Sequence, residues 1–589
     1  MPAARHPAKS ARSRPKERPR PAPAPAGPGW APRPWQVALA LGVLHVLLTL
    51  MALNPAPHLG GDNAAYLALA RSLLEGRGYV ELWDPALRPH TQFPPGFPAI
   101  LAVAMLLGVK PWVGFKVLVA AFSGVAVALS YAWARRVSGP GVALGAGLLL
   151  AVGPGVIDQS QLELSDVPFW VFTMLALWAF ARWSAAAGEP AASPAAAARP
   201  GAAAVAADDA RPAPAWSALK WVALAAVATL LALFTRSAGL PLVVAAAGWL
   251  ALRRRWRELA LFLAVVLPFA VAWAVRQRLA AGGGAYVTQF WLKDPYRPDL
   301  GTIGVGGLFA RVGENALKYV DWHLPSLLAG LPEHPVLIAA AAALVLLAVA
   351  GWARRLRRPG VAELFVPLYL GLILVWPEEW ADSRFILPAL PLMLVYAGEA
   401  LGLAGERLGR RRLVGAGAAA LLVLAAVPGF AKQVRRAEEC RAEYAAGNHF
   451  SCHAPVFGTI FVVAEQVRGR LPEGSVVLSR KPSLFWAISG YPSRLYPFDA
   501  GADGFFAAAA AARARYIVFD QTQEFTRFMR PVVLARRDQF CLMPEIGTEM
   551  AVLARIGPNP PFPPGTAPDV FRICDAPVPP DETAPAPAR

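Results

Sequence analysis

Long apolar segments alternate with short polar breaks between Trp35 and Phe430. Apolar runs of roughly 17–25 residues recur there, which is the length that crosses a bilayer as a helix. The expected spanning helices are residues 35–53, 113–134, 142–157, 167–181, 218–234, 240–252, 259–274, 335–353, 361–376, 385–403 and 413–430. The pattern therefore predicts a polytopic α-helical membrane protein with about eleven transmembrane helices.

One apolar segment, residues 98–109, does not fit this series because about a dozen residues are too few to span a bilayer. It follows the prolines and glycine of residues 94–98, which predict an extended approach and a kink. If this segment spanned, every later basic cluster would change sides of the membrane. We therefore expect a re-entrant or interfacial helix within the first outer segment, residues 54–112.

Only 16% of the residues are charged, whereas soluble domains average about 25%. The net charge of +18 would suit a nucleic-acid partner, but the basic residues gather at the ends of the apolar segments, as the positive-inside rule describes. These clusters are Arg135-Arg136, Arg253-Arg254-Arg255 with Arg257, Arg354-Arg355 with Arg357-Arg358, and Arg410-Arg411-Arg412. They mark the cytoplasmic side and argue against nucleic-acid binding.

Two segments lack the apolar content of a folded core. Residues 1–34 form a basic, Pro- and Ala-rich tail that we expect to be disordered in the cytoplasm. Residues 185–215 are expected to form a flexible cytoplasmic linker. The membrane domain then covers residues 35–430, and residues 431–589 lie outside. In this topology the outer turns hold Asp62, Glu81, Asp84, Asp158, Glu163, Asp166, Glu378, Glu379 and Asp382.

All four cysteines lie in the outer C-terminal segment, which predicts disulfides in an oxidising compartment. Loop length favours Cys440–Cys452 and Cys541–Cys574 among three pairings, and buried free thiols are the alternative. Strand-like runs at residues 475–478, 515–519 and 548–555, with a helix at 482–489, indicate a small α/β domain. This domain contains no nucleotide-binding glycine fingerprint.

A polar break at residues 58–63 follows the first apolar helix and contains Asp62. Apolar residues recur at helical spacing on one face of the segment that follows, and glycines end it at Gly76 and Gly78. We expect an amphipathic helix that lies on the bilayer surface, with Asp62 at its N-terminus. Asp62 is either a simple N-cap or a reactive carboxylate, and capping would fix its direction in both cases.

The first outer segment resembles the corresponding loop of polytopic GT-C glycosyltransferases. The similarity is greatest to protein O-mannosyltransferases and lipid A aminoarabinose transferases. It rests on the order of several loose motifs and spans residues 35–430. The motifs are Gly61-Asp62, residues 66–79, residues 93–98, the Arg135-Arg136 end of the second helix, the acidic turn at 163–166, residues 235–239, and residues 382–391.

The resemblance implies an enzyme that takes a sugar from a polyprenyl-phosphate carrier on the outer face of the inner membrane. The sugar passes to a hydroxyl or phosphate of a lipid, protein or glycan acceptor. Asp62 would act as the base or orient the acceptor. Fixed positive charge would stabilise the leaving phosphate, and Arg384 and then Arg236 are the best candidates for it. The alternative for each arginine is snorkelling to lipid headgroups.

Six further residues are candidates around Asp62. Glu163 and Asp166 could position the acceptor or hold a divalent cation with Asp62, and the alternatives are a helix cap at Asp166 and a solvated Glu163. Tyr66, Trp83 and Phe93 could contact a sugar or lipid, although interfacial anchoring explains such aromatic residues equally well. His90 could join them, but ordinary loop histidines are expected because no zinc-ligand spacing is present. Metal dependence stays open.

Two other functions are alternatives to glycosyl transfer. A transporter or flippase for a lipid-linked sugar would place ionisable residues near the middle of helices. The predicted helix centres are instead Ala, Leu and Val, and the acids cluster on one side. A non-catalytic scaffold would leave the loop around Asp62 and Arg384 without a function. Neither the sugar, hexose or pentose, nor the acceptor is specified by the sequence.

Overall fold

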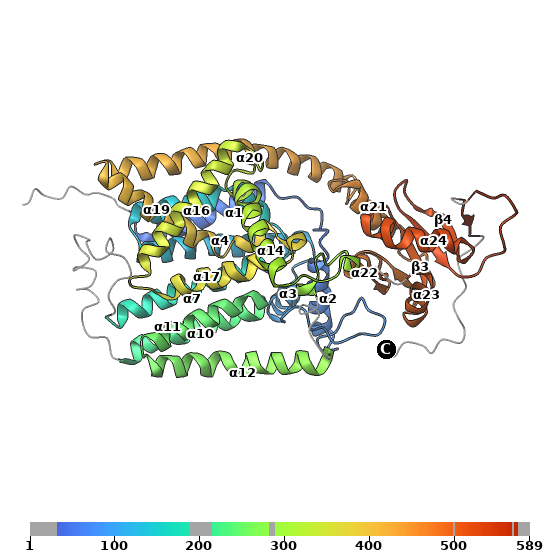
Figure 1. The fold of residues 1–589 in the computed structure, drawn as a ribbon, viewed down its shortest axis with the longest axis horizontal. Coiled ribbons are helices and arrows are strands. Elements are labelled where there is room, and N and C mark those ends of the chain that lie inside the picture. Colours follow the sequence, from blue (N-terminus) through green and yellow to red (C-terminus); the bar gives the residue numbers. More distant parts are fainter. Residues whose placement is uncertain (1–31, 189–214, 282–288, 499–500, 568–569, 575–589) are drawn as a thin grey trace, which may run out of the picture.

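The computed structural model describes residues 32–188, 215–281, 289–498, 501–567 and 570–574. A bundle of long helices carries a smaller domain at one end (Figure 1). The fold class expected from the sequence is therefore confirmed. Most of the predicted basic tail and most of the predicted linker lie outside the described residues.

Each of the eleven predicted spans coincides with a helix of the bundle. These are α1 (Pro34–Met51), α4 (Val113–Val137), α5 (Pro140–Val152), α7 (Asp166–Ala186), α10 (Ala215–Thr235), α11 (Leu240–Leu252), α12 (Trp256–Ala281), α16 (Pro335–Arg355), α17 (Val361–Leu374), α19 (Leu390–Arg407) and α20 (Arg411–Ala445). Within the described ranges, seven helices are long and apolar enough to cross a membrane by length and composition: α1, α4, α7, α10, α12, α16 and α20. The chain is an integral membrane protein.

Shorter helices connect the long ones. They are α2 (Asp62–Leu74), α3 (Gly96–Leu106), α6 (Pro154–Gln159), η1 (Ser237–Gly239), η2 (Pro298–Leu300), α14 (Val305–Lys318), η3 (Tyr319–His323), α15 (Leu324–Ala329), η4 (Glu378–Trp380) and α18 (Ser383–Ile386). The expected non-spanning helix is α3, which at 11 residues is only about 16 Å long. Its exposed residues Val103 and Leu106 suit an interfacial position.

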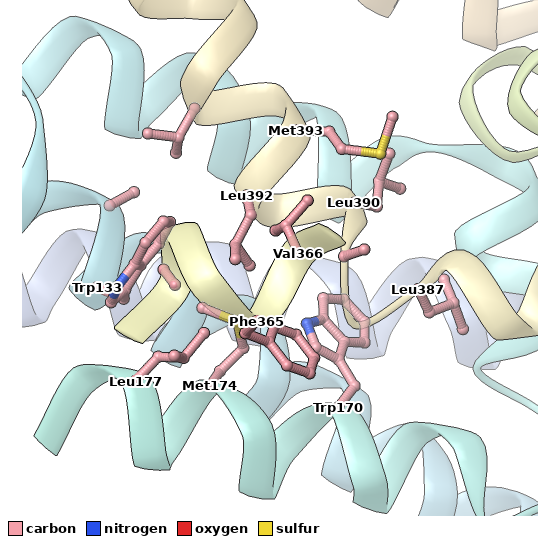
Figure 2. Packing of buried hydrophobic residues seen from close by; sticks show 14 of the residues in the cluster. Trp133, Trp170, Met174, Leu177, Phe365, Val366, Leu387, Leu390, Leu392 and Met393 are labelled. Carbon is pink, nitrogen blue, oxygen red and sulfur yellow. The ribbon is translucent and has the colours of Figure 1, made fainter. Parts of the chain in front are cut away.

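The centre of the bundle is filled by large apolar side chains. Trp133 of α4, Trp170 and Met174 of α7, Phe365 of α17 and Leu392 of α19 are all enclosed and pack together (Figure 2). Leucines and valines on the outer surface of α12 are exposed instead. Such an apolar exterior is stable only in contact with lipid, since water would penalise it.

The predicted helix at residues 142–157 is in fact broken into α5 and α6. A side chain at Gly153 would place its Cβ 2.8 Å from the Leu327 carbonyl oxygen, and one at Gly155 would come within 2.5 Å of the Ser326 oxygen. The close approach of α15 therefore requires glycine at both positions. Periodicity alone could not reveal this contact, because both helices are apolar.

A buried ion-pair network lies at the end of the bundle away from the small domain. The Arg355 guanidinium contacts Glu363 at 3.1 Å and Glu399 at 2.7 Å, and it donates to the Val137 carbonyl at 2.8 Å. These contacts join α16, α17, α19 and the end of α4. Arg355 was expected only to mark the cytoplasmic side, so its structural role is a correction to that interpretation.

We expect Arg355→Ala to lower the free energy of unfolding by about 3–5 kcal/mol, because it leaves two largely buried carboxylates without their counter-charge. Arg354→Ala removes an equal charge from the exposed neighbouring position and should change stability by less than about 0.5 kcal/mol. Thermal unfolding of both variants in detergent measures the difference. Equal melting temperatures would contradict the assignment.

The helix α20 carries the chain from the bundle into the C-terminal domain. It continues without interruption to Ala445, so the predicted domain boundary at residue 431 falls inside a helix. Residues 431–445 consist mainly of Ala, Arg, Glu, Lys and Gln, which favour helix, and a glycine follows only at Gly447.

The C-terminal domain is a six-stranded mixed sheet with helices against it. Its elements are α21 (Pro455–Gln466), β1 (Val476–Leu478), α22 (Pro482–Ser489), β2 (Ser493–Arg494), α23 (Gly501–Ala511), β3 (Ala514–Phe519), η5 (Phe525–Met529), α24 (Arg530–Ala535), η6 (Arg537–Gln539), β4 (Phe540–Gly547), β5 (Val552–Ile556) and β6 (Arg572–Ile573). The strand order is β2-β1-β3-β5-β4-β6, with β1, β2 and β3 parallel. In β3, Ile517 pairs with Leu478 of β1 and with Ala554 of antiparallel β5.

Both predicted disulfides are present. Cys440–Cys452 ties the end of α20 to the segment before α21, and Cys541–Cys574 joins β4 to the chain after β6. The first disulfide thus lies where the chain enters the domain from α20, and the second lies at the β6 edge of the sheet. The predicted small α/β domain is confirmed.

Candidate functional site

Asp62 is the first residue of α2, and Gly61 rather than Asp62 occupies the N-cap position. Gly61 has φ 94°, a left-handed conformation that glycine adopts without strain. The Asp62 side chain makes no capping hydrogen bond and contacts Arg384, with Oδ2 3.6 Å from Nη1. Its side chain is 37% exposed, so a substrate can reach it.

The helix α2 does not lie on the bilayer surface as expected. Residues 63–70 are all buried, and α2 packs between α3 and α22 of the C-terminal domain. Its second face carries Ala64, Ala65 and Ala68, whose small side chains let another helix approach closely. Arg71 adds a cation–π contact with Trp486 of α22, 5.7 Å from the ring centre.

Arg384 lies in α18, which is separate from α19 where the sequence predicted one helix at residues 385–403. Its Nη1 is 3.6 Å from Asp62 and 3.9 Å from Asp166, and its Nε is 3.4 Å from Asp382. The guanidinium also lies 5.0 Å from the centre of the Phe385 ring. Arg384 therefore points into a group of carboxylates rather than toward lipid headgroups.

Arg236 follows α10 and faces the same group. Its Nη1 is 2.6 Å from Asp166 Oδ1 and donates to Ser165 Oγ at 3.3 Å. Tyr66 extends the network through a 3.0 Å hydrogen bond between its hydroxyl and Ser165 Oγ. Asp166 is only 4% exposed and makes no capping hydrogen bond, since Ser165 is the N-cap of α7. Asp166 thus serves as the partner of the two arginines.

Glu163 is not part of this group. It is fully buried, 3.7 Å from Lys116 Nζ, and accepts a 3.3 Å hydrogen bond from the His58 amide. Burial raises the pKa of Glu163 above its ordinary value, and the charge of Lys116 opposes that rise. The expectation of a solvated or substrate-facing Glu163 is therefore wrong, because the side chain is fully enclosed beside Lys116 and the His58 amide.

The proposed cation site of Asp62, Glu163 and Asp166 is also not assembled. Across the part of the chain that the structure describes, no group of three or more His, Cys, Asp or Glu side chains is placed to hold a metal ion. Each of the three carboxylates instead contacts a basic side chain. Glu163 pairs with Lys116, whereas Asp62 and Asp166 share the Arg384 guanidinium.

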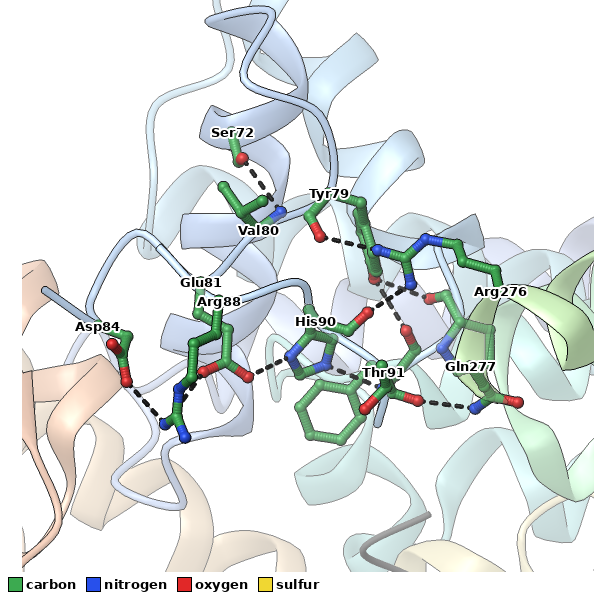
Figure 3. Close-up of polar contacts among 12 residues, drawn as sticks. Ser72, Tyr79, Val80, Glu81, Asp84, Arg88, His90, Thr91, Arg276 and Gln277 are labelled. Atoms are coloured by element: carbon green, nitrogen blue, oxygen red, sulfur yellow. Dashed lines mark hydrogen bonds and ion pairs between the residues drawn. The ribbon is translucent and has the colours of Figure 1, made fainter. Parts of the chain in front are cut away.

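The four residues expected to contact a sugar or lipid, Tyr66, Trp83, Phe93 and His90, pack against one another. His90 is buried, its Nδ1 is 3.0 Å from Glu81 Oε1, and its Nε2 accepts from the Phe93 amide at 2.9 Å (Figure 3). Phe93 packs on Tyr66 with ring centres 4.8 Å apart, and Trp83 packs on His90 at 5.9 Å. Tyr66, one turn after Asp62 in α2, links this packed group to Ser165 through its hydroxyl.

Arg276, at the end of α12, holds this loop against the bundle. It donates to the His90 carbonyl at 2.6 Å and to the Tyr79 carbonyl at 3.0 Å, while Gln277 donates to Thr91 at 2.7 Å (Figure 3). This role was not predictable from the residue pattern, because an arginine near a helix end is also the usual mark of a membrane boundary.

The C-terminal domain also contacts the loop around Asp62. Lys481 Nζ donates to the Gly60 carbonyl at 3.0 Å, and Ser483 Oγ donates to the Gly61 carbonyl at 2.9 Å. Farther along, Arg494 of β2 pairs with buried Asp84 at 3.0 Å. Burial alone would raise the pKa of Asp84, but hydrogen bonds from Arg494 and the Ala86 amide outweigh it and lower the pKa.

The two arginines of the site differ in how firmly they are held. Arg236 makes a short, direct ion pair with Asp166. Arg384 is shared among three carboxylates at 3.4–3.9 Å, and these distances are longer than a good hydrogen bond of about 2.7–3.2 Å. An incoming anion can therefore bind Arg384 without breaking a short contact, whereas Arg236 orients Asp166.

Solved membrane proteins share this fold. ArnT from Cupriavidus metallidurans, bound to undecaprenyl phosphate, has 16% sequence identity and a TM-score of 0.50, covering 89% of this chain and 98% of its own. An oligosaccharyltransferase from Archaeoglobus fulgidus, tethered to an acceptor peptide, has 13% identity and a TM-score of 0.50 over 87% of this chain and 73% of its own. No protein-family model and no curated protein matches the sequence. The chain has the GT-C fold.

Proposed function

We propose that this protein transfers a sugar from a polyprenyl-phosphate-linked donor to an acceptor. The observation that carries the proposal is the convergence of Asp62 and Asp166 with Arg236 and Arg384 at one end of a GT-C bundle. A half-exposed carboxylate beside a loosely held guanidinium suits both halves of the reaction, which are removal of a proton and stabilisation of a leaving phosphate.

In the proposed reaction an acceptor hydroxyl attacks the anomeric carbon of the donor sugar. Asp62 accepts the hydroxyl proton as the new carbon–oxygen bond forms. The bond between the anomeric carbon and the phosphate oxygen breaks, and its electron pair leaves with the lipid phosphate. Arg384 stabilises the negative charge on that phosphate, because a guanidinium binds phosphate oxygens through charge-assisted hydrogen bonds.

We place the site on the outer face of the plasma membrane, with the N-terminus in the cytoplasm. The basic clusters at the ends of α4, α11 and α16 support this orientation, since they gather at the opposite end of the bundle. There Arg355 donates to Val137 of α4, and Trp249 of α11 donates to the Pro359 carbonyl after α16. Basic residues at one end of a bundle favour retention of that end in the cytoplasm.

Transport of the lipid-linked sugar is the alternative function. A transporter needs polar or ionisable groups along a route through the bundle. Trp133, Trp170 and Phe365 fill the centre with apolar surface (Figure 2), and the polar site lies at one end. This arrangement favours chemistry at one face of the membrane over passage through it.

Reconstitution tests the proposal. Purified protein in liposomes is given a panel of radiolabelled polyprenyl-phosphate hexoses and pentoses together with envelope acceptors from a deletion strain. We expect label to move from one donor into one acceptor fraction, which would also identify the sugar and whether the acceptor is a lipid, a protein or a glycan. Movement of the donor across the bilayer without any transfer would contradict glycosyl transfer and support the transporter.

A further inference from the structure

Lys481 brings a basic group from the C-terminal domain to the Asp62 loop. It follows β1 and is the N-cap residue of α22. Its ammonium donates one hydrogen bond to the Gly60 carbonyl, two residues before Asp62. Ser483, which lies in α22, donates a hydrogen bond to the next carbonyl of that turn, that of Gly61. The start of α22 is therefore placed directly beside the proposed reaction centre.

Within the described part of the chain, the ammonium of Lys481 has no carboxylate within 4 Å. The other basic groups here each have an acidic side chain within 4 Å, namely Lys116 with Glu163, Arg236 with Asp166 and Arg384 with Asp62. Lys481 forms no ion pair among the described residues. An ammonium has three donor hydrogens, and the Gly60 carbonyl accepts only one of them. Two donors therefore remain to bind a ligand.

The surroundings of Lys481 disfavour its charge in the absence of a ligand. Burial, together with the positive charge of Arg480, lowers the pKa of Lys481 to about 8. Asp62 and Glu524 oppose this shift, and Arg384 adds to it. An anion bound between Lys481 and Arg384 would relieve the repulsion between these two cations.

We propose that Lys481, together with Arg384, binds the phosphate of the polyprenyl carrier, so that the C-terminal domain supplies part of the donor site. This inference rests on the proposed transfer function. A phosphate carries several acceptor oxygens, which can meet the fork of an arginine on one side and the point charge of a lysine on the other. The positive end of the α22 dipole adds a favourable field at the same place.

Binding measurements on the full-length protein in detergent test the inference. The probes are undecaprenyl phosphate, the uncharged alcohol undecaprenol, and inorganic phosphate. We expect Lys481→Met to weaken binding of undecaprenyl phosphate about ten- to hundred-fold, the usual effect of losing one charged hydrogen bond. Binding of undecaprenol should not change. Lys481→Arg keeps the charge and should bind nearly as the natural protein does.

Ser483→Ala is the matched control for a purely structural role, because Ser483 fastens the same turn without any charge. We expect this variant to keep its affinity for undecaprenyl phosphate. If Lys481→Met also kept its affinity while both variants lost turnover equally, Lys481 would only position Asp62, and the inference would be wrong. A loss confined to inorganic phosphate would equally overturn it, since the lipid would then bind elsewhere.

The pH dependence gives a second readout. A lysine is charged below its pKa, so affinity for undecaprenyl phosphate should fall as the pH rises through about 8. The ligand does not cause this fall, because a phosphate monoester loses its second proton with a pKa of about 6 and becomes more negative as it does so. In Lys481→Arg the profile should stay flat to about pH 10, since arginine keeps its proton. An identical fall in both proteins would contradict the inference.

The failure of this inference is distinguishable from failure of the proposed function. If the natural protein binds undecaprenyl phosphate and transfers sugar while Lys481→Met does both equally well, only the inference about Lys481 fails. If the natural protein neither binds the lipid phosphate nor transfers sugar, the proposed function fails and the inference fails with it.

Discussion

Replacing Asp62 with asparagine is expected to reduce sugar transfer by about 100- to 10,000-fold, the range over which a positioned general base contributes. Asparagine has nearly the same shape as aspartate, but its amide cannot take up the proton of the attacking hydroxyl group. The contact that it weakens, between Asp62 and Arg384 at 3.6 Å, is partly exposed and worth at most about 1 kcal/mol. Folding and membrane insertion should therefore be preserved, and kcat should fall.

The measurement is steady-state transfer with thermal unfolding recorded on the same preparation. Glu75→Gln is the matched control, because Glu75 is a carboxylate at the other end of α2 that forms a surface ion pair with Arg77. This variant should keep full activity. Wild-type turnover by a well-folded Asp62→Asn protein would refute the role of Asp62 as a base.

Arg384→Ala is expected to raise the KM for the lipid donor about 10- to 100-fold and to lower kcat as well. A charged hydrogen bond contributes about 1.5–3 kcal/mol to donor binding. The negative charge on the phosphate grows as its bond to the sugar breaks, so the loss of Arg384 also lowers the rate of transfer. The KM and kcat of Arg384→Lys should lie between those of the alanine variant and the natural protein, since lysine keeps the charge but lacks the planar guanidinium group.

Donor titrations at saturating acceptor separate the two effects of Arg384. Binding of an uncharged polyprenol should be the same in all three proteins, and this equality would show that the substitutions leave binding of the lipid chain intact. If KM and kcat were unchanged in Arg384→Ala, the only role of Arg384 would be to neutralise the negative charges of Asp62, Asp166 and Asp382. The phosphate would then have to be stabilised elsewhere.

The sequence predicted the helices of the membrane part well because most of them are long apolar runs, and seven of the described helices are long and apolar enough to cross a bilayer. The positions of the breaks were not predictable. The interruption at Gly153 depends on the backbone of α15 passing within contact distance. The interruption before α19 separates Arg384, in α18, from the helix at whose outer end it was expected. Contacts between distant segments leave no periodic signal.

The site was predicted in part. Asp62, Asp166, Arg236 and Arg384 come together although they lie far apart in the chain, and each was recognisable as a charged residue in an outer turn. Glu163 shared that pattern but is buried against Lys116. Lys481 was missed because it belongs to a domain without a recognisable motif, and only the folded chain places it beside Gly60.

The central claim is that one end of the bundle binds the phosphate of a polyprenyl carrier next to Asp62. An experimental structure of the protein in lipid nanodiscs with undecaprenyl phosphate tests it most directly. We predict phosphate density within hydrogen-bonding distance of Arg384 and Lys481, with Asp62 facing the space left for the acceptor. Phosphate bound at the opposite end, near Arg253 and Arg254, or away from all three residues, would contradict the account.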